Sequence, residues 1–403
     1  MKKLMAVFKR CLLGAVIGIV CGSASALFLF GLEFVTDAQS SNGWLLWFLP
    51  FGGALISFIY LKAGRGADRG NNLIIEQIYE RKGTIPLRMA PLVLIGTWTT
   101  HLFGGSAGRE GTAVQMGGSL SEWVGERLKL DHGTRQILLI CGISGGFGSI
   151  FGTPLAGALF SLELLVFTSL SFRAALPSLI ASYVGHYTAL TWGVTHAHYK
   201  IGLLPMLQLG TIGKVAAAAI AFGLAARVFT MIVRRLKALL SRLLPHPALR
   251  SFAGGWIIIA LVAITDTREY LGLGLPLLEQ SFSEAAAPSA FALKGLFTAV
   301  TLSAGFQGGE VTPLFVIGAS LGSALSKLLL LTAPFLAAIG MAAVFSSAAN
   351  TPLAGVVMGI ELFGIEAAPY LLAGCGIAYL FSGHSGIYSS QRKGKIKSFI
   401  YRK

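Results

Sequence analysis

Three long segments without a charged residue limit what this chain can fold into. They span residues 11–32, 136–162 and 328–360 and contain 22, 27 and 33 residues. A helix needs about 20 apolar residues to cross the hydrocarbon core of a bilayer. Only 12% of the whole chain is charged, whereas a soluble domain carries roughly 25%. The sequence therefore predicts an all-α integral membrane protein, in which glycine and proline divide the long segments into shorter helices.

The apolar segments continue to the end of the chain, and a turn at Gly210–Gly213 is expected to introduce a second half. We interpret 227–250 as a basic linker, 266–284 as an outer loop, and the amides Asn71 and Asn72 as the start of a helix. We expect apolar helices over 5–34, 44–62, 87–103, 136–150, 154–167, 174–192, 215–233, 256–264, 291–305, 312–330, 334–345, 352–363 and 370–381.

The positive charges are unevenly distributed along the chain. The net charge is +15, and the basic residues gather at the N-terminus, in 62–88, in 227–250 and in the tail 392–403. The segments near Asp37 and over 266–284 carry few cations. This asymmetry is typical of the positive-inside rule. It predicts a multi-pass protein of the cytoplasmic (inner or plasma) membrane with both termini in the cytoplasm, in contact with lipid rather than with nucleic acid.

The N-terminal helix and the cysteines imply no processing or metal chemistry. The basic start and apolar run resemble a signal peptide, but the apolar segment continues beyond residue 26, so we expect a retained helix. The cysteines have no metal-like spacing, and neither a disulfide framework nor a cofactor is expected. They are Cys11, Cys21, Cys141 and Cys375.

A glycine-rich stretch over 104–112 places a charged pair, Arg109 and Glu110, between two apolar segments. An ionisable residue at that depth costs several kcal/mol and marks an ion or proton pathway by default. The glycines also leave N–H groups uncovered at a helix start, where an anion can bind. We therefore expect Gly108, Arg109 and Gly111 to contribute to an anion site beside Glu110.

Two motifs recur in the second half of the chain. Thr-Pro-Leu-Ala-Gly followed by Glu-Leu occurs at 153–164 and again at 351–362, an offset of 198 residues. Gly-Arg-Glu-Gly-Thr at 108–112 returns as Gly-Gly-Glu-Val-Thr at 308–312, an offset of 200. Interrupted helices at equivalent places in two repeats predict a transporter with its site at the repeat interface. The alternative is generic packing of small residues between helices.

Together these motifs resemble the CLC family of chloride channels and anion–proton antiporters. The resemblance rests on Gly-Arg-Glu-Gly, Gly-Gly-Glu-Val-Thr-Pro, Pro-Leu-Ala-Gly and Tyr388, and it covers nearly the whole chain. It implies a CLC-like homodimer in which each subunit has its own pore, built from two inverted repeats of tilted, partly broken helices. Accordingly, we expect one transmembrane domain (1–403) with repeats over 1–204 and 205–391, a basic cytoplasmic tail over 392–403 and no C-terminal regulatory domain.

The resemblance also assigns roles to single residues. Glu110 is similar to the gating glutamate, which swaps with the anion and carries the proton. Asn71 stands where chloride-handling members have a serine, and Val311 and Thr312 take the positions of Phe and Ala in Gly-x-Phe-x-Pro. Tyr388 matches the central tyrosine, so the resemblance implies that all four contribute to anion binding.

The departures from the chloride-handling pattern are similar to the fluoride–proton branch of the family. They are Asn71, Thr112 in place of a proline, and Gly-Gly-Glu-Val-Thr-Pro at 308–313. Leu164 replaces the inner proton-relay glutamate of chloride antiporters, and Glu310 is a candidate for a substitute. The predicted function is export of fluoride in exchange for protons, without enzymatic activity.

Elementary chemistry agrees with this function but is less specific. Burial favours the neutral form of a carboxyl group, so Glu110 can take up a proton near neutral pH. Fluoride is small and strongly hydrated, and its site must replace water with firm donors. Asn71, Thr312 and Tyr388 offer such donors. Selectivity for fluoride over chloride rests on the resemblance alone.

Several alternatives remain open from the sequence. Glu110 can form a permanent ion pair with Arg109, Asn71 can cap a helix, and Tyr388 can be an interfacial anchor. Glu310 can be a structural acceptor for backbone N–H groups, and we expect a structural role for the recurring glutamates, Glu163 and Glu361.

The function has alternatives too. A chloride channel, a chloride–proton antiporter or a passive fluoride channel would use the same site. A distant alternative is an intramembrane serine protease, because Gly-Ile-Ser-Gly at 142–145 matches the surroundings of such a nucleophile. Ser144 would then need His186 as its base.

Overall fold

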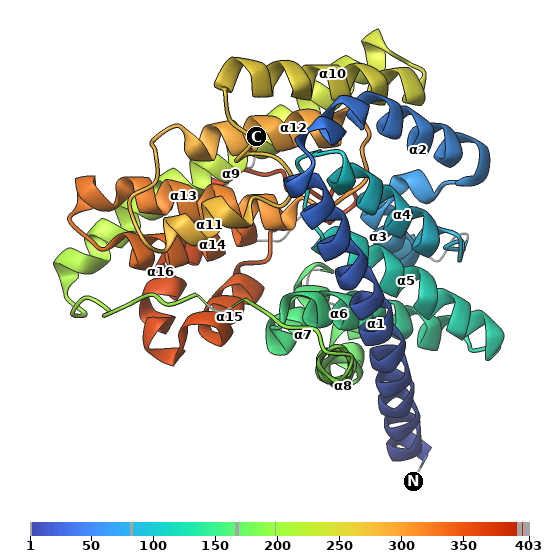
Figure 1. The fold of residues 1–403 in the computed structure, drawn as a ribbon. Helices are drawn as coiled ribbons and strands as arrows, with labels where there is room; N and C mark the ends of the chain where they lie inside the picture. Colours follow the sequence, from blue (N-terminus) through green and yellow to red (C-terminus); the bar gives the residue numbers. More distant parts are fainter. Residues whose placement is uncertain (1, 81–83, 166–168, 198, 393–396, 398–403) are drawn as a thin grey trace.

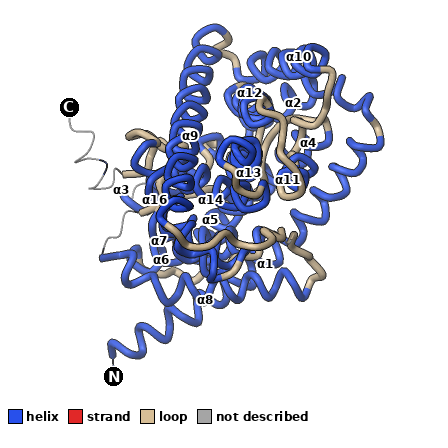
Figure 2. Tube along the Cα trace, turned by 90° about the vertical axis from the view of Figure 1, so that its left-hand side faces the viewer, coloured by secondary structure: helices blue, strands red, loops and turns tan. Residues whose placement is uncertain are grey.

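The computed structural model describes residues 2–80, 84–165, 169–197, 199–392 and 397. The described residues form sixteen α-helices and three short 3₁₀ helices. None of them forms a strand, and the tube in Figure 2 is drawn in helix blue and loop tan. Their one isolated β-bridge joins Gly108 and Gly309. The all-helical class is therefore confirmed.

The helices are numerous in both halves of the chain and range from 7 to 40 residues. The first half contains α1 (Lys2–Ser41), α2 (Leu49–Ala63), α3 (Asn71–Glu80), α4 (Met89–Leu102), α5 (Glu110–Arg127), α6 (His132–Phe151), α7 (Pro154–Glu163) and α8 (Ser169–Thr191). The second half contains α9 (Leu209–Leu243), α10 (Pro247–Thr265), α11 (Leu275–Ser281), α12 (Ala290–Ser303), α13 (Val311–Leu329), α14 (Ala333–Ala349), α15 (Pro352–Phe363) and α16 (Ala368–Phe381). Figure 1 shows α1 tilted along one side and α13 to α16 on the other.

Among the described residues, six helical segments are long and apolar enough to cross a membrane. They are Leu4–Ser41, Gly43–Ala63, His132–Phe151, Leu209–Leu243, Pro247–Thr265 and Val311–Leu329. Other apolar helices, such as Ala333–Ala349 and Pro352–Phe363, have only 10–17 residues. Proline and glycine divide 136–162 between α6 and α7, and 328–360 is divided among α13, α14 and α15, as expected. The expectation is wrong for 11–32, which lies undivided within α1.

Two expectations about connecting segments are wrong. The predicted turn at Gly210–Gly213 and most of the predicted linker 227–250 lie within α9, which has 35 residues. This segment is rich in Ala, Leu, Lys and Arg, all strong helix formers, and has no proline before residue 245. The segment 266–284 does connect α10 to α12 and contains the short helix α11; its position outside the membrane stays a prediction. Phe167, the predicted end of one span, lies outside the described residues.

Ordinary end signals set the bounds of α6. Asp131 precedes the helix, and its carboxylate accepts hydrogen bonds from the Thr134 hydroxyl at 2.7 Å and the Thr134 N–H at 3.0 Å. These bonds hold the pKa of the Asp131 carboxyl below its ordinary value. Gly152 ends α6 in the left-handed conformation, at a φ of 81°. Pro154 then begins α7 at the first turn, where a missing N–H is tolerated.

The two recurring glutamates join the halves of the chain. Glu163 at the end of α7 accepts hydrogen bonds from the N–H groups of Leu353 and Ala354 at 3.0 and 2.8 Å, in the first turn of α15. Glu361 in α15 does the same for Leu155 and Ala156 in the first turn of α7, at 2.8 and 2.7 Å. Each carboxylate satisfies donors that a helix start leaves open. This reciprocal arrangement fits the structural role expected for both.

Glycines allow the central helices to approach closely. A Cβ on Gly318 of α13 would lie 2.1 Å from the carbonyl oxygen of Gly340 in α14. Gly117 of α5 and Gly142 of α6 are in the same relation, at 2.2 Å. Small residues at such contacts are the usual basis of helix packing in lipid. The close packing fixes the starts of α5 and α13, where the predicted site lies.

Candidate anion site at two facing helix starts

The two glycine-rich motifs meet backbone to backbone. The Gly108 N–H donates to the carbonyl oxygen of Gly309 at 2.6 Å, and the Gly309 N–H donates back to Gly108 at 2.8 Å. A Cβ on Gly309 would lie 2.7 Å from the backbone nitrogen of Gly111, so only glycine fits there. The motifs that recur 200 residues apart in the sequence are therefore one structural unit, from which α5 and α13 begin.

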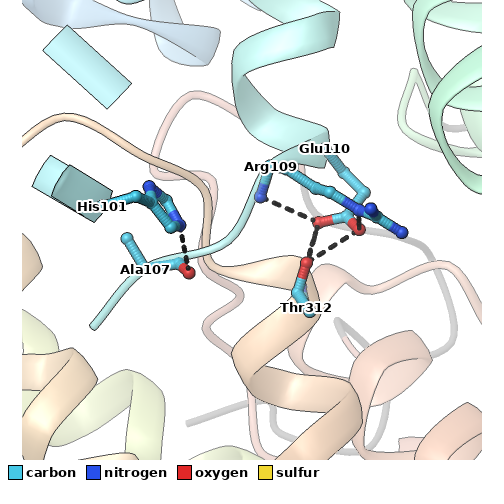
Figure 3. A network of polar contacts seen from close by, with 5 residues as sticks. All are labelled: His101, Ala107, Arg109, Glu110 and Thr312. Atoms are coloured by element: carbon cyan, nitrogen blue, oxygen red, sulfur yellow. Dashed lines mark hydrogen bonds and ion pairs between the residues drawn. The ribbon is translucent and has the colours of Figure 1, made fainter. Parts of the chain in front are cut away.

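Glu110 is the first residue of α5 and has no exposed surface. Its carboxylate lies at the N-terminus of α13, where it accepts a hydrogen bond from the Thr312 N–H at 3.0 Å. The Thr312 hydroxyl lies 2.6 and 2.8 Å from the two carboxylate oxygens (Figure 3). A negative group held by a backbone N–H, a hydroxyl and a helix start occupies the kind of position that binds an anion.

Arg109 contributes less to this contact than Thr312 does. Its Nε lies 3.7 Å from a carboxylate oxygen of Glu110, and its backbone N–H donates to the carboxylate at 3.3 Å. Arg109 Nε has no hydrogen-bond partner. The ion pair considered from the sequence is therefore present, but the shortest bonds of the Glu110 carboxylate go to Thr312.

Asn71 extends toward the same place from the start of α3. A Cβ on Gly111 would lie 3.2 Å from the Asn71 amide nitrogen, so this donor faces the start of α5. The amide oxygen of Asn71 is buried without a hydrogen-bond partner. An amide group that points its nitrogen at the glutamate motif is placed to donate to an anion, rather than only to cap its own helix.

A cavity of about 410 Å³ lies beside these residues and extends to two further predicted ones, Glu310 and Tyr388. Asn71, Gly308, Glu310 and Tyr388 all line it. The Glu310 side chain makes no capping hydrogen bond to the first turn of α13. Tyr388 is buried, and its ring makes an edge contact with Phe160, 6.3 Å between centroids. This position does not suit an interfacial anchor.

The cavity also contains residues that the sequence analysis did not identify. Gln115 lies one turn beyond Glu110 on α5, and its side-chain oxygen is buried without a partner. Basic residues outnumber acidic ones in the wall, and the wall comes from the segments with the most cations. They are Arg65, Arg69, Lys237 and Arg250, against Asp68 and Glu310. The sequence offered no usable signal for them: Gln115 is five residues after Glu110, about 140° around the helix, and the four cations belong to larger basic clusters.

The remaining predicted residues take varied positions. The Gly108 N–H is occupied by Gly309, so in this structure it is not open to an anion. Val311 is buried in the first turn of α13, next to Thr312. Leu164 is buried at the end of α7. The hydroxyl of Ser144 donates to the carbonyl oxygen of Ser178 at 2.7 Å, which is a helix-packing contact and not the geometry of a nucleophile beside a base.

Comparisons with known proteins agree with this geometry. Residues 52–383 match the family model described as voltage gated chloride channel. The chain is 47% identical over 391 residues to a chloride/fluoride channel protein of Pseudomonas syringae pv. tomato, covering 96% of this chain and 86% of that protein.

Two solved structures share the fold. A CLC-type fluoride/proton antiporter superposes with a TM-score of 0.93 at 34% identity, covering 97% of this chain and 99% of that one. A slow cyanobacterial Cl⁻/H⁺ antiporter has a TM-score of 0.82 at 20% identity, covering 94% and 96%. At 20% identity, the similarity to the cyanobacterial antiporter supports the fold alone.

Proposed function

Because this multi-pass membrane protein belongs to the CLC family of voltage-gated chloride channels and antiporters, we propose that it exports fluoride in exchange for protons. The observation that carries the proposal is the Glu110 carboxylate on the N–H and hydroxyl of Thr312. A carboxylate bound at a helix start marks a place that an external anion can take.

The exchange follows from competition for these donors. When Glu110 is ionised, its carboxylate holds the Thr312 donors, and fluoride must displace it. When Glu110 is protonated, its hold on the donors weakens because a neutral acid is a poorer acceptor than a carboxylate. Fluoride then occupies the position, and the proton leaves with the displaced side chain. One residue in this way links the movement of the two ions in opposite directions.

The choice of fluoride rests on relatives and on the donors. The Pseudomonas protein is named a chloride/fluoride channel, and the solved relative at 34% identity is a fluoride/proton antiporter. The Asn71 amide, the Thr312 hydroxyl and the Tyr388 hydroxyl, together with the N–H groups near Gly111 and Val311, supply hydrogen-bond donors for a strongly hydrated anion. Chloride is the competing substrate.

We propose that Glu310 carries the proton on the inner side. Leu164 offers no ionisable group, whereas Glu310 lines the cavity together with Asn71 and Tyr388. The cationic wall of this cavity attracts anions from the side on which the basic segments lie. By the positive-inside rule that side is the cytoplasm, which also places both termini there. No enzymatic step belongs to this proposal.

We propose that the functional unit is a homodimer in which each subunit has one pore. Residues 1–204 and 205–391 would form two inverted repeats around it. The recurrence of both motifs supports the repeats, as do the matched bonds of Glu163 and Glu361 at the starts of α15 and α7. A molecular mass in detergent of twice the chain would support the dimer, and the mass of a single chain would rule it out.

The test is transport by the purified protein in liposomes loaded with fluoride or with chloride. We expect fluoride efflux well above chloride efflux, with proton uptake in the wild type. Glu110→Gln removes the titrating group but keeps its shape, and should abolish proton uptake. Glu126→Gln, on an exposed glutamate at the other end of α5, is the matched control and should transport normally.

Two outcomes would overturn the proposal. Chloride efflux as fast as fluoride efflux would identify the protein as a chloride transporter of the same family. Anion flux without proton uptake in the wild type would identify a passive channel.

A further inference from the structure

Lys294 is a buried cation that the exchange described above does not use. It lies on α12 and has no exposed surface. Its ammonium donates to the Ser106 hydroxyl oxygen at 3.0 Å, to the Tyr270 carbonyl oxygen at 3.1 Å and to the Gly272 carbonyl oxygen at 2.8 Å. Three acceptors match the three N–H bonds of an ammonium group, so its hydrogen bonding is complete.

Hydrogen bonds alone do not balance the charge of Lys294. Among the described residues, none of the ion pairs involves this lysine. Burying an ammonium group without a carboxylate is costly even when it is hydrogen-bonded. An apolar side chain of similar length would fill the same space without that cost. An ionisable residue in a membrane-embedded segment is therefore a candidate for function.

The contacts of Lys294 lead to the glutamate motif. Ser106 lies four residues before Glu110, and its hydroxyl also contacts the Thr298 hydroxyl at 2.9 Å. The Ser106 N–H donates to the Thr301 hydroxyl oxygen at 3.1 Å, so α12 holds this residue at three points. The segment that sets the position of Glu110 is thus fastened to α12 around the lysine.

Other contacts hold the segment and the lysine in place. His101 of α4 lies 3.2 Å from the carbonyl oxygen of Ala107 (Figure 3). Gly274 has a φ of 77° and packs against the lysine, since a Cβ there would lie 3.0 Å from Nζ. The lysine is therefore confined, and both α4 and α12 bond to the segment 104–108.

We propose that Lys294 is a positioning residue for the exchange: its ammonium group joins the 104–108 segment to the 270–272 turn and keeps an uncompensated positive charge behind the segment that carries Glu110. The proposal deepens the proposed function and rests on it. Lys294 acts through Ser106 and the backbone of the segment, without touching the transported anion.

The experiment compares Lys294→Met with Lys294→Arg in the full-length protein in liposomes. Methionine keeps the length and loses the charge, and arginine keeps the charge and several donors. We expect Lys294→Met to lower the maximal rate of anion efflux about tenfold, with the fluoride KM within about twofold and fewer protons taken up per fluoride. Lys294→Arg should recover much of the rate and coupling. A merely structural role predicts no such split between rate and KM and no rescue specific to charge.

Further variants keep the test decisive if Lys294→Met does not fold. Ser106→Ala removes one acceptor and leaves the lysine in place, and it should lower the maximal rate in the same direction by a smaller factor. Ser281→Ala, a buried hydroxyl on α11 that bonds only within its helix, is the matched control and should transport normally. The folded fraction of each variant is measured by gel filtration and thermal melting.

These measurements distinguish a failure of the inference about Lys294 from a failure of the proposed function. All variants are compared for the anion that the wild type carries fastest, fluoride or chloride, and Glu110→Gln is measured in the same vesicles. A folded Lys294→Met that transports at the wild-type rate overturns the inference, and so does a folded Lys294→Arg that is as slow as the methionine variant. If the methionine variant does not fold, a wild-type rate in Ser106→Ala overturns it.

Discussion

At the scale of single residues, the site depends on a few short contacts between backbone groups and one carboxylate. The Glu110 carboxylate shares its charge between the Thr312 N–H and hydroxyl, and these charge-assisted bonds are worth about 1.5–3 kcal/mol each when buried. They exist only because Gly108 and Gly309 let the two motif loops pair directly. A side chain at this junction would separate α5 from α13 and move Thr312 away from the glutamate.

Gly309→Ala tests this junction. The new Cβ would lie 2.7 Å from the backbone nitrogen of Gly111, so the loops must shift apart. We expect at least a tenfold loss of fluoride efflux, measured in liposomes, together with a lower melting temperature. Gly213→Ala is the matched control, because no atom lies within 4 Å of its added Cβ and alanine favours the helix by about 1 kcal/mol. Normal efflux in Gly309→Ala would show that the close pairing is not required.

At the scale of elements, the structure repeatedly places a carboxylate at the start of a helix from the other half of the chain. Glu110 does so at α13, Glu163 at α15 and Glu361 at α7. Each helix start offers uncovered N–H groups and a partial positive charge. What differs is the surrounding space: Glu110 lies next to the Asn71 amide and the cavity, whereas Glu163 and Glu361 bond to packed helices. The same local device therefore serves packing at two places, and at the third it lies beside the cavity where we propose the exchange.

Glu163→Ala tests the packing role. It leaves the N–H groups of Leu353 and Ala354 without their acceptor, and we expect the free energy of unfolding to fall by about 2 kcal/mol. Glu361→Ala should cost less, because its partner Leu155 is more than one-third exposed and water can replace the bond. Thermal melting in detergent shows which of the two variants loses more stability, with Glu366→Ala at an exposed position as control. Equal melting of Glu163→Ala and wild type would contradict the packing role.

At the scale of the whole molecule, the halves of the chain are interlocked rather than placed side by side as separate domains. α5 meets α13, and α7 meets α15, each through contacts between residues about 200 positions apart. The short helices between them place the anion site and its cavity inside the protein, away from lipid. The proposed exchange requires access to this site from both sides, which we expect movement of Glu110 to provide.

The proposed orientation predicts where the C-terminus lies. The basic segments around the cavity and the tail should face the cytoplasm, because positive segments are retained there. A fluorescent protein fused after Lys403 should therefore fluoresce in cells, and alkaline phosphatase fused at the same point should be inactive. An active phosphatase would place the tail outside and reverse the direction assigned to the cavity.

The sequence by itself determined the class of protein, most of the breaks between helices and the recurrence of the two motifs. These properties are local: hydropathy, glycine and proline content and the repetition of short motifs do not depend on the path of the chain. The main errors, at 210–213 and 227–250, came where weak turn signals competed with helix-forming residues. There, helix propensity and tertiary packing prevailed.

Only the tertiary structure decided which groups meet. The contact between Glu110 and Thr312 spans 202 residues of sequence, and the contact between Lys294 and Ser106 spans 188. No periodicity or motif predicts that the cations of 62–88 and 227–250 line one cavity with Glu310 and Tyr388. Contacts between distant segments depend on the simultaneous packing of many helices. The residues that determine this packing are spread over the whole chain.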